Sequence, residues 1–270
     1  MSDLSRRGFL RGLSSLVFGG IASGSSAFGQ EKDTGDSIAT LLETLAQPEP
    51  PGREVEQRRL YEEGELRIDG QINNKMLARV SSLLSELDET LPPHKPITVI
   101  INSEGGDPTI ASAIADKLKY MDRETTTIAE GVVMSAALHI FMAGDDRLAY
   151  SSAVFMEHPV EMIDEKGMPS SSISKTDKEF VRFVTRSGNE AIAKPTTLTA
   201  SQLDMAFSKD CFFGSGFALQ HGIVTGIFGE GGHIIRSVDE LESEIQSPIS
   251  CPGWGASRMM PSPKPVFGVR

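Results

Sequence analysis

The feature that most restricts the fold is an alternation of short apolar strands with amphipathic helices between residues 65 and 160. Strands are expected at residues 66–68, 97–101, 126–128 and 153–156. Helical spacing of apolar residues predicts helices over 74–87, 109–120, 135–143 and 173–192. Alternation of this kind predicts an α/β domain with βαβ units, in which chemistry is placed where a strand turns into a helix.

Three of these strand ends carry residues suited to acyl transfer. Residues 102–106 (Asn-Ser-Glu-Gly-Gly) follow one strand, residues 131–137 contain Ser135 at a helix start, and residues 155–159 end in His158-Pro159. Cleavage of a peptide carbonyl requires a nucleophile, a base and hydrogen-bond donors aimed at the developing oxyanion. Ser135 taken alone is equally typical of a helix N-cap, so its interpretation depends on its companions.

Charge and composition exclude other classes of function. The 270 residues carry a formal net charge of −11 with one Trp and three Tyr, which argues against a nucleic-acid partner. No CxxC or HExxH spacing occurs, so we expect neither a metal nor another cofactor. The two cysteines, Cys211 and Cys251, could form a disulfide or remain as thiols.

The N-terminus resembles a twin-arginine export signal. Arg6 and Arg7 precede an apolar stretch that is too short to span a bilayer, and Ala27 and Gly29 offer a cleavage site before Gln30. We therefore expect a signal peptide over residues 1–29 and a periplasmic or extracellular location.

The rest of the chain divides at changes in composition. Residues 30–60 are polar and contain proline, and we expect a flexible arm with a possible helix near 38–45. The catalytic domain is expected over residues 61–230. Residues 231–270 form a C-terminal extension that is rich in proline and expected to be disordered from about residue 247.

Taken together, these motifs resemble the proteolytic subunit of the Clp protease, within the Clp-protease/crotonase superfamily. The family's NSPGG motif resembles residues 102–106, with Glu104 in place of proline, and its GxxxS turn resembles residues 131–135. Its VMIHQP strand end resembles residues 154–159, and its RDxF segment resembles residues 209–212. The resemblance implies a single-domain superhelix of repeated ββα-type units with a helix-plus-hairpin handle.

The same resemblance implies a serine endopeptidase that forms an acyl-enzyme on Ser135. His158 would be the general base and acid, and Asp210 would orient its imidazole. The N–H groups of Gly106 and Ala136 would form the oxyanion hole. The substrate would be a peptide or an unfolded protein segment bound as an added strand, and the enzyme would be a ring-shaped homo-oligomer.

Two departures from the family pattern affect assembly. Residues 160–170 form a charged, hairpin-like stretch where the family has a glycine-rich strand used to pair opposing rings. An exported protein also meets no ATP pool, so we do not expect an ATP-driven unfoldase as its partner.

Three alternatives remain open. A Ser/Lys dyad of the signal-peptide-peptidase type would use Lys175 or Lys178 as its base, and a crotonase-type enzyme would use Glu104 or Glu157 as acid or base. An inactive superfamily domain would serve as an oligomeric scaffold. Two further residues compete with the proposed triad: Asp204 lies near Asp210 in the sequence, and His139 lies one helical turn after Ser135, where we expect it to be buried.

Overall fold

The structure is a computed structural model that describes residues 52–92, 94–162, 174–241 and residue 251. The expected signal peptide, the helix near 38–45 and the tail after residue 251 lie outside the described residues. Most of the charged stretch at 160–170 lies outside them as well.

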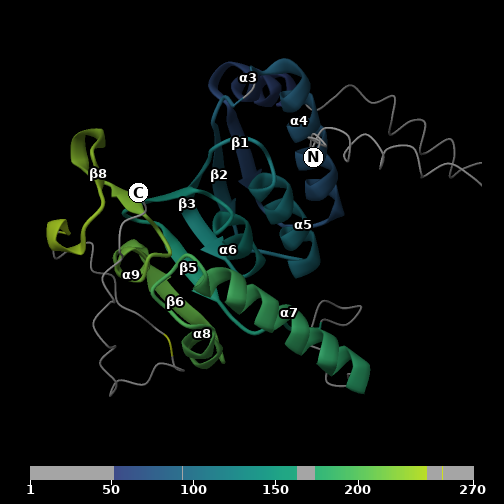
Figure 1. The fold of residues 1–270 in the computed structure, drawn as a ribbon, viewed down its shortest axis with the longest axis vertical. Helices are drawn as coiled ribbons and strands as arrows, with labels where there is room; N and C mark the ends of the chain where they lie inside the picture. The colour runs from purple at the N-terminus through teal and green to yellow at the C-terminus, as the bar shows by residue number, and fades with distance from the viewer. Residues whose placement is uncertain (1–51, 93, 163–173, 242–250, 252–270) are drawn as a thin grey trace, which may run out of the picture. The chain divides into compact units, whose positions relative to one another are not determined.

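Eight strands in the described part of the chain form one sheet (Figure 1). They are β1 (Glu65–Asp69), β2 (Ile97–Ser103), β3 (Thr125–Met134), β4 (Asp146–Tyr150), β5 (Val154–Glu157), β6 (Cys211–Gly214), β7 (Gly226–Phe228) and β8 (Ile234–Ile235). The order along the main path is β1-β2-β3-β4-β7-β8, while β5 pairs with β3 and with β6. Pairing is parallel except between β5 and β6 and between β7 and β8.

Helices connect and cover these strands. They are α3 (Arg53–Glu63), α4 (Asn74–Thr90), α5 (Pro108–Lys119), α6 (Ala136–Phe141), α7 (Lys175–Ala193), α8 (Ala200–Ala206) and α9 (Ser215–Gln220), with short 3₁₀ turns at Glu230–Gly232 and Val238–Glu240. The starts of α4 and α5 are capped by the side chains of Asn73 and Asp107, which accept backbone N–H groups of the first turn. The parallel strands β1, β2 and β3 alternate with helices, as the sequence predicts, whereas β4 is not among the expected strands.

Strand β3 is the point at which the sheet divides. Its first half, Thr126 to Ala129, pairs with β4, and its second half, Val132 to Met134, pairs with β5. Gly131 lies between the two halves at φ 73°, a conformation that favours glycine. The division carries the end of β3 away from β4 and places it beside β5, where two of the candidate site residues lie.

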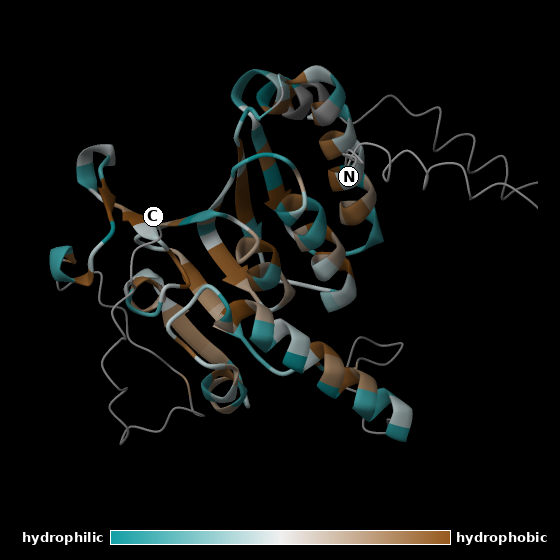
Figure 2. Cartoon of the chain, in the orientation of Figure 1, coloured by the Kyte–Doolittle hydropathy of each residue, from teal (hydrophilic) through white to brown (hydrophobic). Residues whose placement is uncertain are grey.

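The core lies between the sheet and its helices, and Figure 2 shows that the apolar residues gather along the strands. Below β5 and β6 the core is aromatic: Phe155 contacts Phe141 and Phe213 at ring-centroid distances of 5.5 Å, and Phe213 also contacts Phe217. These rings are buried, and their contacts with one another stabilise the packing of β5 and β6 on the core.

Four expectations about element boundaries differ from the structure. Residues 53–60, expected in the flexible arm, belong to α3, because Leu60 packs into the core at 0% exposure. Strand β3 continues past Gly131, and α6 begins at Ala136 rather than at Ser135. The C-terminal extension contributes β8, which pairs with β7.

Within the described ranges, no helix combines the length and the apolar character needed to cross a membrane.

Candidate active site

Ser135 occupies the turn between β3 and α6. Its backbone has φ 51° and ψ −126°. Ser135 is one of two non-glycine residues with a positive φ in the described part of the chain. Such a conformation costs on the order of 1–3 kcal/mol, and here the hydrogen bond from Ser135 N–H to the Met156 carbonyl of β5 (2.7 Å) stabilises it. Ser135 occupies the N-cap position of α6, but its side chain makes no capping hydrogen bond to the helix and is directed instead to His158.

His158 directly follows β5 and meets Ser135. Its Nε2 lies 2.8 Å from Ser135 Oγ, and both side chains are part-buried. This distance is that of a hydrogen bond between a nucleophile and its base. The structure therefore brings together two of the three residues singled out as a triad, which are 23 positions apart in the chain.

The glycine turn after β2 lies against Ser135. A Cβ built on Gly105 would come within 3.0 Å of Ser135 Cβ and 3.2 Å of Ala136 N. A Cβ on Gly106, which has φ 152°, would overlap the Ile72 carbonyl. Only glycine allows this approach, so the turn and the first N–H of α6 lie side by side.

Side chains of the preceding motif hold this turn in place. Ser103 Oγ accepts the Gly105 N–H (3.0 Å) and donates to the Gly70 carbonyl (2.6 Å). Asn102 Oδ1 accepts the Val132 N–H of β3. The Asn-Ser pair before the glycines therefore joins β2 to the loop after β1 and to β3.

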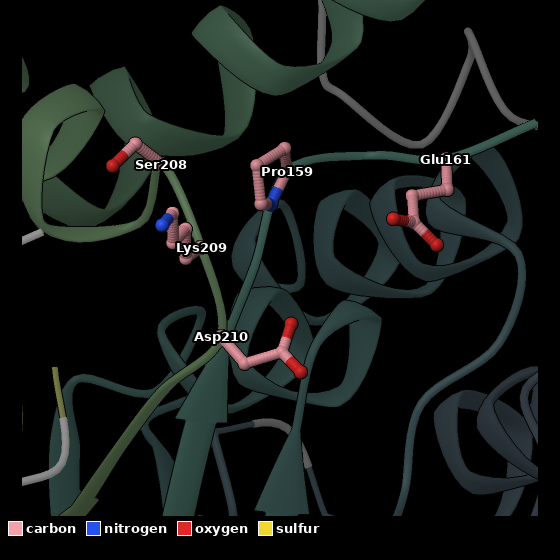
Figure 3. A pocket seen from close by; sticks show the side chains of 5 residues that line it. All are labelled: Pro159, Glu161, Ser208, Lys209 and Asp210. Carbon is pink, nitrogen blue, oxygen red and sulfur yellow. The ribbon is translucent and has the colours of Figure 1, made fainter. Parts of the chain in front are cut away.

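Asp210 precedes β6, and its backbone lies next to His158 because β5 and β6 are antiparallel. Its side chain is exposed, and no hydrogen bond among the described residues joins its carboxylate to His158. Asp210 lines a pocket of about 440 Å³ together with Pro159, Glu161, Ser208 and Lys209. Figure 3 shows these five side chains. The third residue of the expected triad is thus adjacent to His158 in the strand pairing and is not hydrogen-bonded to it.

Comparison with protein families matches residues 53–231, well over half of the chain, to the family described as Clp protease. The chain belongs to the Clp protease family. It is 31% identical over 170 residues to the ATP-dependent Clp protease proteolytic subunit of Pleurastrum terricola, a match that covers 61% of this chain and 83% of that protein. The corresponding subunit of Chlorella vulgaris is 26% identical over 168 residues, covering 62% of this chain and 82% of the relative.

The fold agrees with this membership. The solved structure of a ClpP1 point mutant from Listeria monocytogenes superposes with a TM-score of 0.57, covering 65% of this chain and 96% of that chain at 23% identity. The expectation of a ClpP/crotonase-like α/β fold is confirmed, and membership of the Clp protease family makes the chain a relative of ClpP-type serine peptidases.

The residues that compete for the roles of His158 and Asp210 do not contact Ser135 through any described hydrogen bond. Lys175 and Lys178, in the first turn of α7, are exposed, whereas a Ser/Lys dyad needs a buried lysine. Asp204 on α8 accepts a hydrogen bond from the Asn189 side chain (2.7 Å) and is engaged there. Among the described residues of this Clp protease family member, the base facing Ser135 is His158.

Glu157, which the sequence offers as an acid or base of a crotonase-type enzyme, is a buried carboxyl beside His158. Glu157 ends β5 with its side chain 6% exposed, and desolvation by burial raises the pKa of Glu157 to about 8. Its Oε2 lies 3.7 Å from Nε2 of His139 in α6, whose side chain is 10% exposed, and desolvation lowers the pKa of His139 to about 4. The signal for this burial in the sequence is a glutamate at the otherwise apolar strand end 154–157.

Cys211 and Cys251 form a disulfide, which settles the alternative that the sequence left open. Cys211 is the first residue of β6 and directly follows Asp210. The bond therefore ties residue 251 to the start of the strand that positions Asp210.

Proposed function

We propose that this chain is an exported serine endopeptidase that hydrolyses peptides or unfolded protein segments through an acyl-enzyme on Ser135. The observation that carries the proposal is the 2.8 Å contact between Ser135 Oγ and His158 Nε2, made at a strained turn beside a glycine loop. Membership of the Clp protease family supports the same reaction class.

In the proposed reaction, Ser135 Oγ attacks the scissile carbonyl while its proton passes to His158 Nε2. The C–N bond then breaks, and His158 returns the proton to the departing amine. Water, deprotonated by His158, next attacks the acyl-enzyme. The ester C–O bond then breaks, and His158 returns the proton to Ser135 Oγ as the acid product leaves. Asp210 holds the imidazolium once its carboxylate turns toward Nδ1, a side-chain rotation that the exposed position of Asp210 permits.

The N–H groups of Gly106 and Ala136 would stabilise the oxyanion. Their placement is supported by the 3.2 Å separation between a Cβ built on Gly105 and Ala136 N. Such donors act strongly because they are oriented before the charge develops. An extended substrate would add as a strand along the residues that follow Gly106 and His158.

We also propose that the enzyme acts outside the cytoplasm as a homo-oligomeric ring. The paired arginines Arg6-Arg7 support export, and so does the Cys211–Cys251 disulfide, since such bonds persist in oxidising compartments. Ring assembly is supported by family membership. After export we expect no ATP-driven unfoldase partner, so the substrates are peptides or segments already unfolded.

The test is labelling of the purified mature protein with a fluorophosphonate probe. We expect labelling of the wild type and loss of labelling in Ser135→Ala and His158→Ala. Lys178→Ala is the matched control, because Lys178 is an exposed residue of α7 that could serve only a dyad. Labelling that persists in His158→Ala would overturn the assignment of the base, and an unlabelled wild type would overturn the proposed function.

A further inference from the structure

Two ionisable side chains with little exposure come from β5 and α6, the elements that border His158 and Ser135. Glu157 Oε2 is 3.7 Å from His139 Nε2, and the two side chains are 6% and 10% exposed. Oε2 has no hydrogen-bond partner in the described structure. A buried carboxyl oxygen without a partner carries a large desolvation cost when it is charged, so the protonation state of this pair matters to the core around it.

The pair joins the elements that carry the two reacting side chains. Glu157 directly precedes His158, and its Oε1 accepts the His158 N–H at 3.4 Å. His139 lies in α6, about one turn beyond Ser135. A change in the separation of Glu157 and His139 would therefore move β5 relative to α6, and with them the two atoms that are 2.8 Å apart.

Helix α7 completes the enclosure of His139. A Cβ on Gly188 would come within 2.5 Å of His139 Cε1, so glycine at this position makes room for the ring. Glycine weakens a helix interior, and the close approach of His139 accounts for its presence in the middle of α7. Three elements thus converge on this imidazole.

The charge state of the Glu157–His139 pair depends on the ionisable groups that surround it. On the elements packed around it, the ionisable groups include His158 after β5, Asp210 before β6, and Asp204 of α8, which is hydrogen-bonded to the buried Asn189 of α7. On α7 itself, Arg186 and Glu190 are exposed and pair with each other. Cys211, opposite Glu157, is in a disulfide and does not titrate. Burial raises the pKa of Glu157 and lowers that of His139, so at neutral pH the pair holds one proton and no net charge.

We propose that Glu157 and His139 are a positioning pair, in which the uncharged Glu157 carboxyl lies against the uncharged His139 imidazole and keeps β5 registered on α6, so that His158 stays aligned with Ser135. This inference rests on the proposed function. Loss of the proton leaves an uncompensated carboxylate in the core, and the elements separate enough to lengthen the Ser135–His158 contact. Activity then falls at alkaline pH while the chain remains folded.

The first experiment does not depend on catalysis. Urea unfolding is measured from pH 5 to pH 9 in a Ser135→Ala background, with and without Glu157→Gln. The folded state holds the Glu157 proton up to about pH 8, whereas the unfolded state releases it near pH 4.5, so stability falls as pH rises between these values. Relative to the variant, the unfolding equilibrium constant should rise by up to about tenfold per pH unit in this window and level off above it.

The second experiment measures the fluorophosphonate labelling rate against pH. From pH 7 to pH 9 we expect the wild-type rate to fall by about tenfold, because roughly nine tenths of Glu157 ionises one unit above its pKa. Glu157→Gln, which keeps the shape and cannot ionise, should show no such fall. Glu89→Gln, at an exposed position of α4, is the matched control and should behave as wild type.

Parallel unfolding curves with identical alkaline labelling limbs in wild type and Glu157→Gln would overturn the inference. If Glu157→Gln does not fold, Glu157→Met serves instead, since it fills the same buried space without an ionisable group and should likewise show no alkaline fall. An unlabelled wild type with the expected unfolding curves would refute the proposed reaction and keep the uncharged pair. If the wild type is labelled but the unfolding curves of wild type and Glu157→Gln stay parallel across pH, the proposed reaction stands and the positioning pair is refuted.

Discussion

Glu157 of β5 lies opposite Cys211 of β6 in the antiparallel pairing, and this register sets the next residue on each side, His158 and Asp210, against one another. The same pairing turns Glu157 and Cys211 into the core and leaves Asp210 at the surface. One strand pairing thus positions the proposed base, its proposed orienting acid and a buried carboxyl.

Replacement of Asp210 by asparagine should lower kcat by about 10²- to 10⁴-fold with little change in KM. The amide cannot stabilise the imidazolium or select the tautomer that presents Nε2 as an acceptor. Steady-state hydrolysis of a fluorogenic peptide measures the effect, and Asp204→Asn is the control because Asp204 is engaged with Asn189. Unchanged kcat in Asp210→Asn would remove Asp210 from the mechanism.

Gly106→Ala should be strongly destabilising. Its Cβ would overlap the Ile72 carbonyl at a backbone φ of 152°, so the change combines backbone strain with overpacking, at a cost of about 3 kcal/mol. Gly70→Ala isolates the strain, because Gly70 has φ 78° with open space around its Cβ position, and should cost about 1–2 kcal/mol. Urea unfolding compares the two, and equal losses would show that the close approach to Ile72 is unimportant.

Cys251→Ser should destabilise the domain by about 4 kcal/mol under oxidising conditions. The disulfide joins residues 40 positions apart, and its loss increases the conformational entropy of the unfolded chain, which accounts for this cost. Thermal unfolding with and without a reductant measures this change. The reductant should lower the Tm of the wild type to that of the variant and leave the variant unchanged. A wild type indifferent to reductant would contradict the prediction.

His139→Gln should flatten the loss of stability at acid pH. Because the pKa of His139 is lowered from 6.5 to about 4 in the fold, the unfolded state binds the proton first, and stability falls as the pH drops from 6.5 toward 4. This one group accounts for at most about 3 kcal/mol of that loss. Urea unfolding at pH 7 and pH 4.5 measures the difference, with His233→Gln as the exposed control. Equal losses in both variants would show that His139 is protonated without penalty.

Local patterns predicted four of the eight strands and four of the seven α-helices in the described part of the chain. Apolar periodicity in residues 74–87 corresponds to α4, which extends to Thr90, and the apolar run at 97–101 corresponds to β2. The predicted end of the strand at Gly131 is wrong because glycine occurs both in loops and at bends within strands. Here β3 bends at Gly131 and changes its partner from β4 to β5. Helix α3 was missed because its sequence is mostly polar and only tertiary contact buries Leu60.

The sequence by itself determined the order of the strand ends and the residue types at each, so Ser135, His158 and Asp210 could be singled out together with the glycine turn. Only the tertiary structure decided which atoms meet. The Ser135–His158 contact, the Cys211–Cys251 bond and the burial of Glu157 against His139 all depend on strand register and helix packing. A shift of one residue in a strand reverses the face of every side chain, and the energy that sets the register comes from the whole sheet and its core rather than from any local segment.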